Sequence, residues 1–183
     1  MNIALIVVDI QNDYFDGGKN PLNNPIKAAK NARIALDIFR NNNLPIFHIQ
    51  HINLQDGATF FLPNTIGNEI NDIVKPTPNE RIFIKHKPNS FFQTGLNEIL
   101  EKNGINKIII CGMMSHMCID TTVRAAKDYL YETLVLSDAC TTKDLIWENR
   151  KILAEDVHKT FMASLQGTFA TIIKTNELEN WIN

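Results

Sequence analysis

The stretch IIICGMMSHMCIDTTVRAA, residues 108–126, joins a strand, a turn and the start of a helix. Its first part, Ile108–Ile110, is a β-branched apolar run, which is typical of a strand buried on both faces of a parallel sheet. The strand ends at Gly112, and a helical pattern follows Cys118. Because backbone N–H groups and the helix dipole favour an anion at a helix start, we expect a lowered pKa and a nucleophilic sulfur at Cys118.

Two charged residues also follow buried-strand patterns. Asp9 comes directly after the apolar run Ile3–Val8, and Lys85 comes directly after Ile82–Ile84. Open α/β sheets build their sites at the carboxyl ends of parallel strands. If the strands are parallel neighbours, the carboxylate, the ammonium and the thiol of Cys118 meet at one edge. A single cysteine indicates only packing, whereas three reactive groups at three strand ends indicate a site.

Strand and helix patterns alternate along the chain, which predicts a three-layer α-β-α fold. We expect a Rossmann-like, doubly wound, mainly parallel six-stranded sheet in a single domain spanning residues 1–183. The other expected strands are Leu44–Ile52, Thr133–Leu136 and Thr168–Ile173. The expected helices are Pro25–Asn42, a segment from Thr94 or Gly95 to Asn103, Ile119–Leu130, Asp144–Leu165 and a short one near Glu177. Asn53–Asn79 is expected to be irregular.

Composition narrows the functional class. The net charge is −2, without a run of like charges, which argues against nucleic acid or a membrane surface as partner. No apolar window approaches the roughly 18 residues that span a bilayer. The three cysteines are irregularly spaced, which argues against disulfides or zinc and suits a reducing cytoplasm. The expected partner is a small molecule or a second copy of the chain.

Three segments carry a family resemblance. VVDIQNDYF (7–15), IKHKPNSFFQTGL (84–96) and CGMMSHMCIDTTVRAA (111–126) resemble, in order and spacing, the isochorismatase-like cysteine hydrolase superfamily. That superfamily includes nicotinamidases and N-carbamoylsarcosine amidases. The likeness extends from Ile3 to about Leu178, nearly the whole chain.

The resemblance implies an amidohydrolase that forms a covalent acyl-enzyme. In that reading Cys118 is the nucleophile, Asp9 moves the proton and Lys85 stabilises both by charge. The resemblance also implies a cis peptide between Met113 and Met114, with the N–H groups of Met114 and Cys118 as the oxyanion hole. It further implies a homodimer or homotetramer.

Further residues are expected around these three groups. Gln11, two residues after Asp9, is expected to help fix the local geometry of the site. The expected substrate-binding residues are Gln11, Phe15, Gln50, His51, Phe61 and Phe91, with Phe60 as a further wall of a lid or a subunit interface. Asp13 and Asp16 are interpreted as turn residues, Cys140 as packing and His158 as a helix-surface residue.

No catalytic metal or other cofactor is expected. His48 and His51 are three positions apart on a strand, so they point to opposite faces and cannot converge on one ion without a bulge. Metal-dependent nicotinamidases carry an Asp-x-His pair in this region. Here Ile49 stands two residues before His51.

Two other functions remain open at this point. Isochorismatases proper cleave a vinyl ether and typically have glycine where this chain has Cys118, so the cysteine favours the amidohydrolase branch. The other alternative is a non-catalytic binding module whose thiol senses oxidants, with Asp9 and Lys85 only tuning its pKa.

Overall fold

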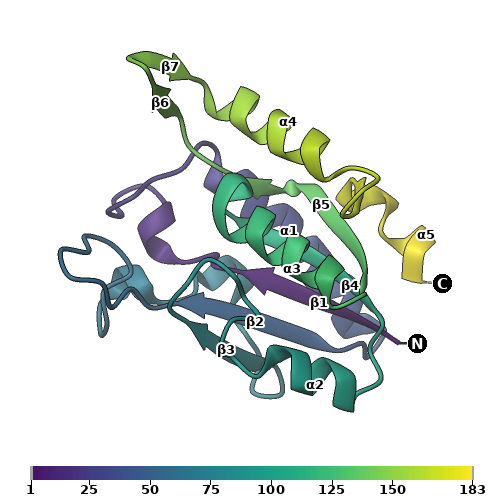
Figure 1. Cartoon of the computed structure of the whole chain (residues 1–183). Helices are drawn as coiled ribbons and strands as arrows, with labels where there is room; N and C mark the ends of the chain where they lie inside the picture. The colour runs from purple at the N-terminus through teal and green to yellow at the C-terminus, as the bar shows by residue number, and fades with distance from the viewer. Residues whose placement is uncertain (1, 183) are drawn as a thin grey trace.

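The computed structural model describes residues 2–182. Its centre is a parallel six-stranded sheet in the order β3-β2-β1-β4-β5-β8 (Figure 1). The strands are β1 (Ile3–Val8), β2 (Ile46–His51), β3 (Arg81–Lys85), β4 (Lys107–Met113), β5 (Glu132–Thr141) and β8 (Thr171–Ile173). The predicted doubly wound, three-layer fold is confirmed, and this sheet is wholly parallel.

Helices cover both faces of the sheet (Figure 1). They are α1 (Pro25–Asn41), α2 (Leu96–Lys102), α3 (Asp120–Asp128), α4 (Ala154–Leu165) and α5 (Glu179–Ile182). Short helical turns occur at η1 (Asn12–Tyr14), η2 (Ile66–Asn68), η3 (Asp72–Val74), η4 (Ser115–Ile119) and η5 (Thr175–Glu177). No helix among residues 2–182 is both long and apolar enough to cross a membrane.

β1 shows why both faces must be covered. Ile3, Leu5 and Val7 pack on the α1 side, whereas Ala4, Ile6 and Val8 pack on the side of α2, α3 and α4. All six are buried, as the period of two along a strand requires. Fully burying one Leu or Ile side chain contributes about 1.5–3 kcal/mol, so this strand is fixed from both sides. Its carboxyl end is therefore a rigid support for Asp9.

The predicted helix Asp144–Leu165 is wrong in its first half. That part forms an antiparallel hairpin, β6 (Leu145–Trp147) with β7 (Arg150–Ile152), and α4 begins only at Ala154. Glu148 and Asn149 connect the two strands with φ of 47° and 62°. Two consecutive residues with positive φ are typical of the tight turn that matches the twist of a hairpin.

Candidate active site

The register of the sheet places three strand ends together. Val8 pairs with Ile49 of β2 and with Gly112 of β4, so all three strands end at the same level. Lys85 pairs with His51 at the end of β2. The strands that deliver Asp9 and Lys85 are therefore not neighbours, because β2 lies between them. The long lysine side chain crosses the end of β2 to reach the carboxylate.

The three predicted catalytic groups meet in the interior. Lys85 Nζ lies 2.7 Å from Asp9 Oδ2 and 3.1 Å from Cys118 Sγ. Asp9, Lys85 and Cys118 are 0%, 1% and 4% exposed, respectively. A buried carboxylate is tolerated only with a partner, and here the ammonium provides it. The thiol thus lies beside a base and a cation in a site from which water is largely excluded.

Cys118 is presented by a tight turn after β4. A cis peptide bond joins Met113 and Met114, as expected, and the Met114 carbonyl accepts hydrogen bonds from the N–H groups of Met117 and Ile119 at 3.0 and 3.2 Å. The second bond closes a five-residue π-helical turn, η4, which contains Cys118. Such turns are common at functional sites because they re-aim side chains. The oxyanion hole of Met114 and Cys118 N–H groups stays a prediction.

The expected lowering of the Cys118 pKa is wrong. Burial raises the pKa of this thiol well above its ordinary value, and the negative charge of Asp9 adds to that rise, so the opposing effect of Lys85 is outweighed. Cys118 is therefore a neutral thiol at pH 7. For Lys85, burial alone would lower the pKa, but the negative charge of Asp9 raises it, so the ammonium persists. The thiol consequently needs a base to become a nucleophile.

Asp9 is arranged as that base. Its backbone has φ of 52°, in the left-handed region, and is held there by a hydrogen bond from its N–H to Ile49 O and by one from Gln11 N–H to its own carbonyl, each 3.0 Å long. Residues held in such conformations concentrate at functional sites. Within the described residues 2–182, Asp9 Oδ1 has no hydrogen-bond partner although it is buried. This oxygen is free to accept a proton from the thiol or from a substrate.

His51 completes the contacts of the ammonium. Its Nδ1 lies 3.0 Å from Lys85 Nζ, and burial followed by the lysine charge lowers the pKa of His51 to about 4. The neutral ring accepts from Lys85 at Nδ1, which places its proton on Nε2. Lys87 O also accepts from this ammonium, at 3.1 Å. The three ammonium protons are therefore surrounded by four acceptors: His51 Nδ1, Lys87 O, Asp9 Oδ2 and Cys118 Sγ.

Ligand atoms of Asp9, His51 and Cys118 lie within 4.8 Å of one another, a spacing that a metal ion could use. Lys85 Nζ is within 3.1 Å of all three of those atoms. An ammonium thus stands where a metal ion would have to bind, and two cations cannot share that position. The residues present therefore do not fit a metal ion while Lys85 remains in place.

Gln11 is a positioning residue, because all of its side-chain polar atoms are hydrogen-bonded within the protein, whereas the expected substrate contact of Gln50 stays a prediction. Gln11 is fully buried; its Nε2 donates to His51 O and Asn68 O at 2.9 and 2.7 Å, and its Oε1 accepts from His51 N–H at 2.8 Å. Gln50 Nε2 donates to the carbonyl and side-chain oxygens of Asn68. The fixing role expected for Gln11 matches these bonds. Asn68, which sequence reasoning missed, joins the loop after β2 to this network.

The aromatic wall differs in part from the prediction. Phe61 is fully buried, with its ring 5.9 Å from that of His51 and 4.6 Å from that of Tyr14. Tyr14, which sequence reasoning missed, is buried against Phe61, and burial together with the negative charge of Asp9 raises its pKa. The adjacent Phe15 lines an outer hollow with loop residues instead.

Phe91 also lies elsewhere. Its ring stacks near Tyr129 and Tyr131, at 5.1 and 6.0 Å, where α3 ends and β5 begins. That is the end of α3 opposite to Cys118. Its expected substrate contact is therefore wrong, and it belongs to the core.

Asp13 holds two loops together and is not only a turn residue. Its Oδ1 accepts from Lys19 N–H at 3.1 Å and its Oδ2 accepts from Phe61 N–H at 2.6 Å, although the side chain is buried. Gly67 packs directly on this carboxylate, since a Cβ there would lie 2.1 Å from Oδ1. Phe61 itself has φ of 56°, which is unusual for a bulky residue. Asp13 thus fixes the wall residue in an unfavourable backbone conformation.

Replacing Asp13 with alanine is expected to lower the free energy of unfolding by about 2–4 kcal/mol, because two N–H groups lose their acceptor. Urea denaturation would measure this loss. Asp16→Ala, at an exposed position in the same loop, is the matched control and should change stability little. Equal midpoints for the two variants would contradict the anchoring role of Asp13.

The lowered pKa of His51 predicts that the stability of the fold depends on pH. Between about pH 6.5 and 4 the unfolded chain binds a proton on this ring that the folded chain does not, because the folded pKa is about 4. The free energy of unfolding therefore falls as pH is lowered through this window, by up to about 3 kcal/mol. Denaturation of wild type and His51→Gln at both pH values measures this contribution. Parallel losses in the two proteins would contradict it.

The turn that carries Cys118 is also tied to α4 and to the residue that follows β5. Ser115 Oγ lies 2.7 Å from His158 Nδ1, and His116 Nδ1 hydrogen-bonds Thr142 Oγ1. His158 was expected on the helix surface, but it is half-buried and faces this turn. Neither pair has a sequence signal, because each joins positions far apart in the chain.

Comparison with known proteins identifies relatives of this chain. The Isochorismatase domain model matches residues 3–177. The isochorismatase family protein YddQ of Bacillus subtilis is 51% identical over 177 residues, covering 97% of this chain and 98% of its own. The crystal structure of an isochorismatase from Pseudomonas putida superposes with a TM-score of 0.90 at 33% identity, covering 96% and 89%. Nicotinamidase 3 of Arabidopsis thaliana is 25% identical, covering 96% and 86%. The chain is thus a hydrolase of the isochorismatase family.

Proposed function

We propose that this protein is a metal-independent cysteine hydrolase that cleaves a C–N bond of a small amide or carbamoyl compound. The observation that carries the proposal is the buried constellation in which Lys85 Nζ contacts both Asp9 Oδ2 and Cys118 Sγ, at 2.7 and 3.1 Å. A thiol, a base and a fixed cation are the groups that acyl transfer through a covalent intermediate requires.

The first half-reaction consumes the thiol proton. Asp9 takes the proton from Cys118 as the sulfur bonds to the carbonyl carbon, so the thiolate need not exist beforehand. Negative charge passes to the carbonyl oxygen, where the N–H groups of Met114 and Cys118 are the proposed donors. The intermediate collapses when the C–N bond breaks, and Asp9 returns the proton to the leaving nitrogen. The product of this step is a thioester on Cys118.

The second half-reaction uses water. Asp9 removes a proton from the water as its oxygen bonds to the thioester carbon, and the carbon–sulfur bond then breaks. The proton returns to the sulfur, so the resting pair of Asp9 and Lys85 is restored. Throughout, Lys85 stabilises whichever of its neighbours carries the negative charge.

Two rival functions receive less support. A vinyl ether hydrolase needs no nucleophile, so the contacts of Cys118 with Lys85 would have no purpose. An oxidant sensor needs an accessible thiolate, whereas Cys118 is 4% exposed and its pKa is raised by burial. One relative, which is 25% identical to this chain, is named nicotinamidase 3, and its name supports the amide branch.

The test is ammonia or amine release from a panel of small amides, carbamoyl compounds and ureas, with isochorismate included, in the presence and absence of a chelator. Rapid-quench mass spectrometry on any substrate that is turned over should show the acyl group on the Cys118 peptide. Turnover that requires added metal, or that proceeds without an adduct on Cys118 in the pre-steady state, would count against the mechanism. Turnover of isochorismate alone would favour the vinyl ether reaction.

A further inference from the structure

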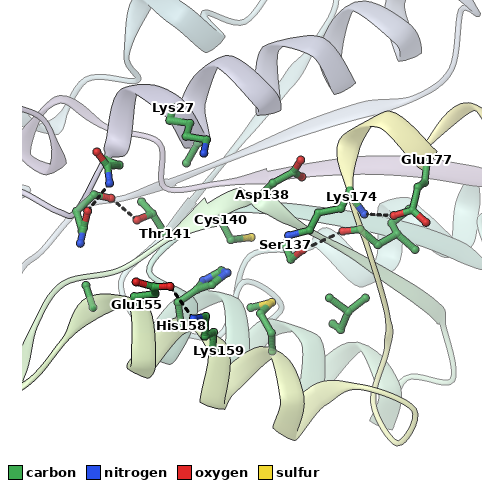
Figure 2. A pocket seen from close by; sticks show the side chains of 17 residues that line it. Lys27, Ser137, Asp138, Cys140, Thr141, Glu155, His158, Lys159, Lys174 and Glu177 are labelled. Carbon is green, nitrogen blue, oxygen red and sulfur yellow. Dashed lines mark hydrogen bonds and ion pairs between the residues drawn. The ribbon is translucent and has the colours of Figure 1, made fainter.

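A cavity lies away from the triad of Asp9, Lys85 and Cys118. β5 continues to Thr141, whereas its outer neighbour β8 ends at Ile173, opposite Leu136. The space beyond the end of β8 is a cavity of about 730 Å³, lined by α1, the last part of β5, α4 and η5 (Figure 2). Neither Asp9, Lys85 nor Cys118 lines it. Its size is within the range of small-molecule sites.

The walls of this cavity are charged, but the acids are engaged. Asp138 Oδ1 accepts from Thr175 N–H and Oγ1–H at 2.9 and 2.8 Å, and Glu177 accepts from Lys174 N–H at 2.7 Å. Glu155 pairs with Lys159 at 2.6 Å. These three carboxylates therefore already have donors.

Two ammonium groups at the cavity are not engaged in this way. Within residues 2–182, no carboxylate lies within ion-pair distance of Lys27 Nζ or Lys174 Nζ. Lys27 comes from α1 and Lys174 from the end of β8, so they approach the cavity from two sides (Figure 2). The lining holds as many lysines as acids, which favours a ligand with one negative charge over a dianion.

The floor is apolar. Ala28, Cys140, Met162 and Ile173 are each more than nine-tenths buried and face this space. In Figure 2 the Cys140 sulfur lies in the middle, between α1 and α4. Contact with these side chains would remove the apolar part of a ligand from water. The cavity thus offers an apolar bed with ammonium groups at its edge.

His158 connects this cavity with the catalytic turn. It lines the cavity from α4, and its Nδ1 is 2.7 Å from Ser115 Oγ, three residues before Cys118. Burial and the charge of Lys174 lower the pKa of His158, so the ring is neutral at pH 7 and can offer an N–H to a ligand. The cavity is one hydrogen bond from the turn that presents the nucleophile.

We propose that this cavity is a second binding site, for a small monocarboxylate with an apolar body. The carboxylate would lie between Lys27 and Lys174 and the apolar body against Cys140 and Met162. This inference goes beyond the proposed hydrolase function and does not depend on it, because none of these residues belongs to the triad.

The test is ¹H–¹⁵N NMR titration with benzoate and phenylacetate, and with benzyl alcohol as the uncharged counterpart. Shifts are expected at the backbone amides of 23, 24, 26–28 and 137–141, and the alcohol should bind more weakly. Since a hydrolase can also retain a carboxylate product at its triad, the same titration of Cys118→Ala should give the same shifts. Shifts confined to residues around Cys118 would overturn the proposal.

Charge-neutral variants test the ammonium contacts. Lys27→Gln combined with Lys174→Gln is expected to weaken benzoate binding by about tenfold. Lys30→Gln, one turn further along α1 and outside the cavity, is the matched control. An unchanged Kd in the double variant, or no binding of either carboxylate to the wild-type protein at about 10 mM, would overturn the proposal.

Discussion

Replacing Cys118 with alanine is expected to lower kcat by about 10⁴-fold or more on any substrate that the panel identifies, because no acyl-enzyme can form. The substitution removes one buried sulfur atom, so the fold should persist with a loss of about 1–2 kcal/mol. Stopped-time ammonia assays and urea denaturation measure the two quantities separately.

Cys111→Ala is the matched control for this experiment. Cys111 is a fully buried cysteine of β4, on the α1 side of the sheet and outside the constellation. It should lose similar stability and keep its turnover. If Cys118→Ala retained wild-type kcat, the sulfur would not be the nucleophile.

Replacing Asp9 with asparagine is expected to reduce kcat by about 10²–10⁴-fold, since the proton acceptor is lost. It should also make the Cys118 thiol more reactive, although turnover falls. The negative charge of Asp9 raises the pKa of Cys118, so its removal lowers that pKa and increases the thiolate fraction at a given pH. Alkylation of Cys118 by iodoacetamide is therefore expected to become faster while turnover becomes slower. A purely structural role for Asp9 would not separate the two rates in this way.

The same substitution leaves Lys85 buried without its counter-ion, which typically costs about 3–5 kcal/mol. Glu80→Gln provides a comparison, because Glu80 pairs with Arg40 at 2.7 Å and with His48 at 2.9 Å, outside the site. That variant should lose stability but keep kcat. A matching fall in kcat in both variants would attribute the Asp9 effect to destabilisation.

The sequence predicted the sheet and the meeting of the three groups because both follow from local patterns. Apolar runs such as Ile3–Val8 are buried on both faces, and a charge directly after such a run has to emerge at the sheet edge. The strand order was not predictable in this way. β2 lies between β1 and β3, and its last residue, His51, contacts Lys85. That contact depends on the pairing of strands that are far apart in the sequence.

The errors have physical causes. Residues 144–153 have helix-forming composition, yet Glu148 and Asn149 adopt a hairpin turn, so tertiary context overrides propensity. The pKa of Cys118 depends on burial depth, which no local pattern records. Asp13 and Tyr14 matter through contacts with Phe61, which is separated from both by more than forty residues.

The zero net charge of Asp9, Lys85 and Cys118 has a consequence for substrate selection. One carboxylate, one ammonium and one neutral thiol sum to zero, and these groups already neutralise one another behind an aromatic wall. An ionic group entering beside them would lose its hydration without gaining a new counter-ion, which is costly. The enzyme is therefore expected to discriminate by polarity at the scissile end, accepting an uncharged amide or carbamoyl group and rejecting the same molecule when that end carries a carboxylate or an ammonium.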